Sequence, residues 1–225
     1  MEPITFAELS TMIYFSLDAK RYLDAQEAEF KLFDLDTELA CLRTGPNEVV
    51  VVFLGSCSIV DWTYNLKFWM VPFALDNNPE IKVHHGMNEK IKVTFDFLDD
   101  RIKPTDTVYF TGHSLGGGLS LLAAYGAKTR IGANIGGVYV FGTPPVGNRE
   151  WQKAYNGITE LREVTHDYMI KGDWVGFLPL KCFGYRPVGR DTVNLEAASY
   201  FPNIIHKHLP WTYVGAIRKY YAEES

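Results

Sequence analysis

The sequence has few cysteines, no long apolar run and no excess of basic residues. Its 225 residues contain 3 cysteines, Cys41, Cys57 and Cys182, without a C-x-x-C pair. An odd number of cysteines without that spacing predicts neither a disulfide framework nor a zinc site. The longest apolar runs, Val49–Leu54 and Phe68–Leu75, are far shorter than the roughly 18–20 residues of a membrane-spanning helix.

The charge balance and the missing motifs exclude several classes of ligand. The chain has 22 Lys and Arg against 27 Asp and Glu, a net charge of −5, so no nucleic-acid partner is predicted. No G-x-G-x-x-G with a following acid and no Walker A motif is present, and no cofactor is predicted. The N-terminus lacks the basic and apolar regions of a signal peptide, so we expect a cytoplasmic protein.

The chain has enough hydrophobic residues to form a core. Hydrophobic residues make up 47% of the chain and aromatic residues 14%, and a domain of this length buries about 70% of its unfolded surface. No linker, low-complexity tract or repeat marks a boundary. The sequence therefore predicts one domain over residues 1–225.

Strand and helix patterns alternate along the chain. The uninterrupted, mostly β-branched run Val49–Leu54 is typical of a strand buried on both faces of a parallel sheet. The same reading predicts strands at 30–33, 39–42, 107–111, 138–141 and 162–165, and helices at 6–22, 87–98, 115–129 and 213–221. This alternation predicts an α/β fold with a mostly parallel sheet.

One short motif points to a nucleophile. Gly112-His113-Ser114-Leu115-Gly116 fits G-x-S-x-G between a predicted strand and a predicted helix. The tight turn leaves no room for side chains two residues before and two after the serine, and both positions are glycine. The Ser114 hydroxyl then lies at a helix N-terminus, where free amides stabilise negative charge.

A serine nucleophile needs a base and an acid that orients the base. In α/β-hydrolases the chain order is serine, acid, histidine. Spacing alone leaves three histidines after Ser114 and several acids as candidates: His166, His206, His208, Asp167, Asp173 and Asp191.

Six segments carry motifs in a fixed order: Val49–Ser56, Asp61-Trp62, Lys82–Met87, Gly112–Gly117, Phe141–Asn148 and Asp173–Pro179. In this order they resemble the class 3 lipases, the group of fungal triacylglycerol lipases and related plant and bacterial enzymes. The resemblance runs from about Glu38 to Tyr213. It implies an α/β-hydrolase fold, with helices on both faces of a mostly parallel central sheet. Four positions depart from the family pattern without removing a catalytic group: Leu54 and Pro145 replace arginines, Met87 a phenylalanine and Gly176 a proline.

The resemblance also implies the acid and the base. Asp173 stands at the aspartate of the family's D-x-V-P motif, and His208, with Tyr213 five residues on, matches the C-terminal histidine. His206 is the alternative base, because alternate residues of an extended segment point to opposite sides and only one can face Ser114. His166 and Asp167 are then polar residues at a strand end.

The family's oxyanion hole corresponds to Ser56 and Leu115. Two preset amides at these positions would stabilise the tetrahedral intermediate without reorganisation. His113, beside the nucleophile, is interpreted as a packing and hydrogen-bonding residue. His84 and His85 form no metal site in this interpretation, since adjacent strand residues point apart.

Aromatic residues suggest where an acyl group binds. Residues 58–65, with Trp62, are either a lid over Ser114 or a core-packing helix, and residues 68–73 either line an acyl pocket or belong to a strand. Trp62, Trp174 and Phe177 are the predicted substrate-binding residues.

The sequence thus predicts a serine ester hydrolase acting on acylglycerols or other medium-to-long acyl esters, with transient contact to a lipid interface. A phospholipase A1, a feruloyl-type esterase or an acyltransferase would use the same triad. A non-catalytic binding protein on this fold is a further alternative.

Overall fold

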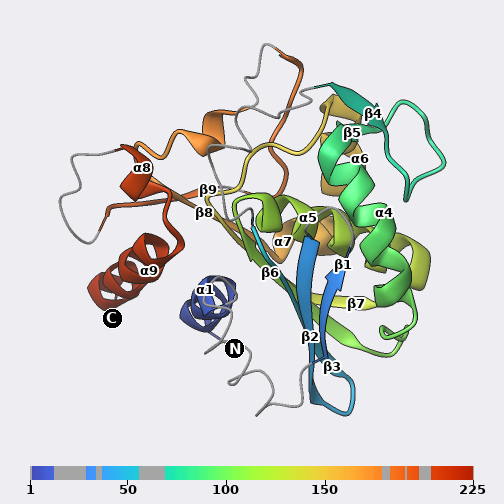
Figure 1. Cartoon of the computed structure of the whole chain (residues 1–225), viewed down its shortest axis with the longest axis horizontal. Coiled ribbons are helices and arrows are strands. Elements are labelled where there is room, and N and C mark those ends of the chain that lie inside the picture. The colour runs from blue at the N-terminus through green and yellow to red at the C-terminus, as the bar shows by residue number, and fades with distance from the viewer. Residues whose placement is uncertain are drawn as a thin grey trace.

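The computed structural model describes residues 2–12, 29–33, 37–55, 69–178, 183–190, 192–197 and 204–224. Its centre is a seven-stranded sheet in the order β1-β2-β3-β6-β7-β8-β9 (Figure 1). The strands are β1 (Glu29–Phe33), β2 (Thr37–Gly45), β3 (Glu48–Phe53), β6 (Thr107–His113), β7 (Asn134–Phe141), β8 (Thr165–Ile170) and β9 (Thr192–Leu195). Strand β2 pairs antiparallel with both β1 and β3, whereas the pairs β3–β6, β6–β7, β7–β8 and β8–β9 are parallel. The predicted mostly parallel α/β sheet is confirmed.

Helices cover both faces of this sheet, as predicted (Figure 1). They are α1 (Pro3–Met12), α4 (His85–Asp99), α5 (Leu115–Gly126), α6 (Arg149–Gly157), α7 (Thr159–Glu163), α8 (Ile204–Lys207) and α9 (Pro210–Glu224). Helices α1 and α9, from opposite ends of the chain, lie side by side on one face, whereas α4 and α5 lie on the other. A small separate sheet joins β4 (Met70–Pro72) to β5 (Lys82–His84).

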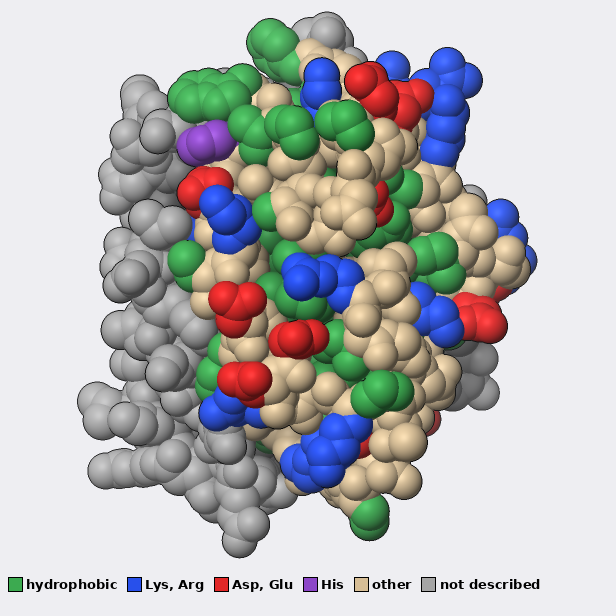
Figure 2. Space-filling model, turned by 90° about the vertical axis from the view of Figure 1, so that its right-hand side faces the viewer, with side chains coloured by type: hydrophobic (Ala, Val, Ile, Leu, Met, Phe, Trp, Pro, Cys, Tyr) green, Lys and Arg blue, Asp and Glu red, His purple; other side chains and the backbone are tan. Residues whose placement is uncertain are grey.

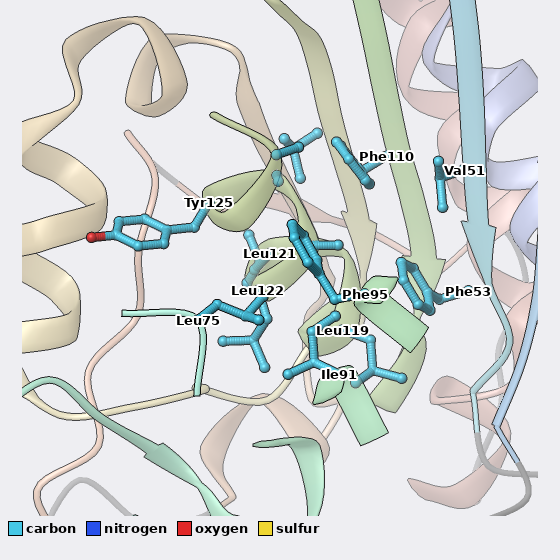
Figure 3. Close-up of a cluster of buried hydrophobic side chains, with 14 of the residues drawn as sticks. Val51, Phe53, Leu75, Ile91, Phe95, Phe110, Leu119, Leu121, Leu122 and Tyr125 are labelled. Atoms are coloured by element: carbon cyan, nitrogen blue, oxygen red, sulfur yellow. The ribbon is translucent and has the colours of Figure 1, made fainter. Parts of the chain in front are cut away.

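Strand β3 contributes to a core on each face, as its apolar run predicts. Val51 and Phe53 point towards α4 and α5, where they pack with Phe95 and Leu119 (Figure 3). Val50 and Val52 join the second core beneath α1 and α9. All of these side chains are almost fully buried, so the hydrophobic effect holds the sheet between two helical layers.

Some predicted boundaries are wrong. The strand predicted at 162–165 is displaced, because residues up to Glu163 form α7 and β8 begins only at Thr165. Leu161 is fully buried in that helix, so its packing overrides the strand pattern. Strand β7 begins at Asn134 rather than 138. The helix predicted over 115–129 is α5 as far as Gly126 and continues as a short π-helix, η1 (Ala127–Ile131).

The strand β7 extends further because of its two glycines. A Cβ on Gly136 or Gly137 would meet the rings of Tyr109 and Tyr139, so glycine lets the strand continue beneath these aromatic residues. At the N-terminus, α1 matches the first half of the helix predicted over 6–22, and residues 13–28 lie outside those described. The single domain over 1–225 stays a prediction.

The surface carries both signs of charge. Figure 2 shows a face on which Lys and Arg side chains are interspersed with Asp and Glu, with hydrophobic side chains gathered towards its upper end. Within the part of the chain that the structure describes, none of the helices has both the length and the apolarity needed to cross a bilayer.

Candidate active site

The turn between β6 and α5 has the geometry predicted for a nucleophile. Ser114 has φ 57° and ψ −123°, and no other non-glycine residue among those described has a positive φ. A Cβ on Gly112 would overlap the backbone of Gly116, and one on Gly116 would overlap the backbone of Phe53. The two glycines thus permit the close approach of helix and strand that holds Ser114 in this strained conformation.

Backbone hydrogen bonds fix the turn in place. The Ser114 amide donates to the Phe141 carbonyl at 2.9 Å, and the Gly117 amide donates to the Ser114 carbonyl at 3.1 Å. Leu115, the first residue of α5, is buried. Its amide belongs to the first turn of the helix, where N–H groups lack intrahelical acceptors. This end of α5 is therefore suited to holding a negative charge.

Asp173 and His208 lie together at the same end of the sheet. His208 Nδ1 is 2.7 Å from Asp173 Oδ2, and both side chains are fully buried. Asp173 Oδ1 accepts a hydrogen bond from the Val175 amide at 3.0 Å. His208 Nε2 is buried and has no hydrogen-bond partner among the described residues. The carboxylate therefore orients the ring and leaves Nε2 available to exchange a proton.

His113 connects this pair to the serine. Its ring packs against that of His208, with centroids 4.6 Å apart, and it directly precedes Ser114. Burial lowers the pKa of His113 well below its usual value, and the nearby His208 lowers it further, while hydrogen bonding to the His208 backbone acts in the opposite sense. His113 thus stays neutral and packs against the ring of His208, in agreement with its predicted packing role.

His206 lies elsewhere. It is exposed on the short helix α8, whereas His208 follows that helix and is buried. The segment is not extended as that argument assumes, because His206 lies within α8 and His208 directly follows the helix. The structure brings His208, and not His206, to the carboxyl group of Asp173.

Tyr213 has a role that its spacing from His208 did not specify. Its hydroxyl donates to Asp173 Oδ2 at 2.5 Å and accepts from the Ile170 amide at 3.3 Å. Burial, together with the charge of Asp173, raises the pKa of Tyr213, so the hydroxyl remains a donor. Gly142 (φ 58°) makes room here, because a Cβ on it would meet the Tyr213 hydroxyl and the His208 ring.

We expect Tyr213→Phe to lower the free energy of unfolding by about 1–3 kcal/mol, since a buried carboxylate and a buried amide each lose a partner. Denaturant titration at neutral pH measures this loss. Tyr109→Phe is the matched control, because it removes a hydroxyl from a half-buried tyrosine on the same face of the sheet. Equal stability of wild type and Tyr213→Phe would show that the hydroxyl does not support Asp173.

The structure describes some of the predicted oxyanion and substrate-binding residues and not others. Ser56, Trp62, the segment 58–65 and the side chain of Phe177 lie outside what the structure describes. Trp174 is partly buried, next to Asp173. Within the apolar segment 68–73, Met70–Pro72 form strand β4, as the strand alternative predicts, while Trp69 is 53% exposed and Phe73 is buried.

His84 is a helix cap. Its Nδ1 accepts from the Gly86 and Met87 amides at 3.1 and 3.4 Å, at the N-terminus of α4. Burial lowers the pKa of His84 to about 4, with a smaller contribution from the charge of His85. Only the neutral ring can accept these bonds. Among the residues described, no group of three or more His, Cys, Asp and Glu side chains is arranged to hold a metal ion.

This cap predicts a pH-dependent stability. Above a pH of about 6.5 the imidazole is neutral in both folded and unfolded chains, and below it the unfolded chain takes up the proton first. The contribution of His84 is therefore lost as the pH falls from about 6.5 towards 4. His84→Asn keeps a capping acceptor but cannot titrate. Between about pH 7.5 and pH 5, the free energy of unfolding of wild type should fall by about 2 kcal/mol more than that of this variant.

Urea titrations of both proteins at the two pH values measure the difference. Other groups that titrate in this pH range change the free energy of unfolding of both proteins equally, so their contributions cancel in the difference. Parallel pH profiles for the two proteins would mean that His84 does not titrate on unfolding.

The sequence of the chain matches a known protein family. The sequence profile of the family described as Lipase (class 3) matches residues 50–183, more than half of the chain. The chain belongs to the class 3 lipase family. Its strained serine turn and its buried Asp173–His208 pair are therefore features of a class 3 lipase chain.

Individual relatives agree with this membership. The chain is 29% identical over 200 residues to phospholipase A(1) DAD1, chloroplastic, of Arabidopsis thaliana, covering 76% of this chain and 42% of that protein. It is 30% identical over 167 residues to a lipase of Rhizomucor miehei, covering 68% and 44%. This class 3 lipase chain thus spans less than half the length of either relative.

A solved structure supports the fold. A deletion mutant of the Rhizomucor miehei lipase, in complex with its propeptide, superposes on this class 3 lipase chain with a TM-score of 0.70 at 22% sequence identity. The match covers 86% of this chain and 66% of that one. The α/β-hydrolase architecture is therefore confirmed.

Proposed function

We propose that this chain is a carboxylic ester hydrolase that acts through a Ser114–His208–Asp173 triad and an acyl-enzyme intermediate. The observation that carries the proposal is the buried Asp173–His208 pair, 2.7 Å apart, beside the strained turn that bears Ser114. A nucleophile, an oriented base and a helix N-terminus at one place are the parts that acyl transfer needs.

In the first half of the reaction, Ser114 Oγ attacks the ester carbonyl carbon and His208 Nε2 takes the hydroxyl proton. Asp173 stabilises the resulting imidazolium. The Leu115 amide, with that of Ser56, would hold the oxyanion. The carbon–oxygen bond to the alcohol then breaks, and His208 returns its proton to the leaving oxygen.

In the second half, water attacks the acyl-enzyme. His208 accepts a proton from this water, a second tetrahedral intermediate forms, and Ser114 leaves with the proton returned by His208. The carboxylic acid is released. The cycle uses only side chains, backbone amides and water, so we propose that it needs no cofactor.

The proposed substrates are acylglycerols or other medium-to-long acyl esters, which the name of the Rhizomucor miehei relative, a lipase, supports. A phospholipase A1 activity is the second candidate, because the Arabidopsis relative carries that name. Transient contact with a lipid interface is supported by Trp69 and Phe183, which are 53% and 56% exposed. The cytoplasmic location stays a prediction of the sequence.

Labelling with a fluorophosphonate probe tests the proposal, because this probe reacts preferentially with activated serine hydroxyls. Mass spectrometry of the digested protein should find the modification on Ser114. Rates on a triacylglycerol, a phospholipid and short p-nitrophenyl esters then distinguish lipase, phospholipase and esterase. A folded protein that neither reacts with the probe nor hydrolyses any of these esters would instead be a non-catalytic member of the fold.

A further inference from the structure

A second concave site lies on the α5 side of the sheet. It is a cavity of about 230 Å³, and neither Ser114 nor His208 lines it. Leu121, Val140 and Val146 supply apolar, buried walls, and Leu121 comes from α5 (Figure 3). The exposed residues Pro187 and Thr192 also line it, so the cavity opens to solvent at the edge of the sheet.

Strand register places a carboxyl group in this cavity. Asp167 of β8 lies between Val140 of β7 and Thr192 of β9, and residues in register across a sheet share one face. Asp167 therefore faces the cavity together with these two neighbours, all of which line it. Met169 and Asn194, two residues further along the same pair of strands, line it too.

The carboxyl group is only half satisfied. The Thr192 hydroxyl donates to Asp167 Oδ2 at 2.9 Å, whereas Oδ1 is buried without a hydrogen-bond partner among the described residues. The described lining contains no Lys, Arg or His, and Asp167 is its only titratable residue. A buried carboxylate with a free acceptor is unfavourable unless a donor or a cation reaches it.

Asp167 is nonetheless charged at slightly alkaline pH. Burial raises its pKa to about 6, and the Thr192 hydrogen bond opposes that shift. At pH 7.5 Asp167 is therefore ionised in most molecules, and its negative charge lies against the apolar walls of the cavity. Charge-assisted hydrogen bonds to ammonium groups are about twice as strong as neutral ones, so the site favours a cationic donor over a neutral one.

We propose that this cavity binds a small organic ammonium ion, with its apolar body against Leu121, Val140 and Val146 and an N–H group donating to Asp167 Oδ1. The volume suits such a ligand, because a cavity of about 150 Å³ holds a benzene molecule. Neither Ser114 nor His208 is among the described residues that line this cavity, and the proposed binding does not depend on ester hydrolysis.

Three phenyl compounds of similar size and different charge test the proposal on the wild-type protein: benzylammonium, benzyl alcohol and benzoate, titrated at pH 7.5 by calorimetry or by NMR chemical shifts. Benzylammonium should bind roughly tenfold or more tightly than benzyl alcohol, the difference expected between a charge-assisted and a neutral hydrogen bond. Benzoate should not bind. Equal affinities for the first two probes, or no saturable binding of benzylammonium, would overturn the proposal.

Variants locate the ligand. Asp167→Asn should remove the preference for benzylammonium over benzyl alcohol, whereas Asp99→Asn, a change to an exposed carboxylate on α4, should keep it. Ser114→Ala should bind benzylammonium like wild type, which separates this result from the fate of the proposed hydrolase activity. An unchanged preference in Asp167→Asn would place the ligand elsewhere and overturn the proposal.

Discussion

Replacing Ser114 by alanine should lower ester turnover roughly 10⁴–10⁶-fold, the loss expected when the nucleophile of a serine–histidine pair is removed. The change deletes one buried oxygen and leaves a non-glycine residue at φ 57°, so the backbone strain of the turn is unchanged. Folding should therefore be nearly unaffected. The measurement is kcat on a p-nitrophenyl ester, with the free energy of unfolding followed in parallel.

Ser120→Ala is the matched control for this experiment. Ser120 lies on the same helix, is fully buried and donates to the Gly116 carbonyl at 2.8 Å. Its replacement also removes one buried hydroxyl, but away from the chemistry, so turnover should stay near that of wild type. If Ser114→Ala and Ser120→Ala were equally active, Ser114 would not be the nucleophile.

Replacing His208 by alanine should lower kcat roughly 10³–10⁶-fold, whereas His206→Ala should keep most of the activity. Removing His208 takes away the proposed acceptor of the Ser114 proton and leaves Asp173 buried without its histidine partner at 2.7 Å. His206 is exposed on α8, so we expect its loss to leave the Asp173–His208 pair intact. Single-turnover and steady-state rates of both variants, checked for folding by circular dichroism, measure the contrast.

A double variant distinguishes catalysis from simple destabilisation. Residues that act as one unit are strongly non-additive, so His208→Ala combined with Asp173→Asn should be little slower than His208→Ala alone. His208→Gln offers a second test, because it fills more of the space left by the imidazole. Loss of activity in His206→Ala with retention in His208→Ala would reassign the base.

Local signals in the sequence were sufficient for much of the fold and for the tight turn that carries Ser114. Val49–Leu54 is a strand because its apolar, β-branched residues can be buried on both faces, and β3 packs that way. Gly112 and Gly116 predict the tight turn because only residues without side chains fit where helix and strand touch. These constraints act within a few residues, so sequence spacing expresses them directly.

Contacts between distant segments needed the tertiary structure. Motif resemblance selected Asp173 and His208 from several candidates, but the reason for preferring His208 over His206 lies in α8, whose helical turn leaves His206 exposed. The hydrogen bond from Tyr213 to Asp173 joins residues 40 positions apart. No local pattern encodes such a contact, because it depends on how α9 packs against the end of β8.

For Asp167, too, the sequence predicts one part of the description and the tertiary structure decides the rest. By itself, the sequence determines that a carboxyl group follows His166 in an apolar stretch, which is compatible with a polar strand end. Only the pairing of β7, β8 and β9 decides that this group faces a cavity, with Oδ1 unpartnered among the described residues. The physical reason is that a strand residue's surroundings are set by its neighbouring strands, whose register is fixed by side-chain packing far along the chain.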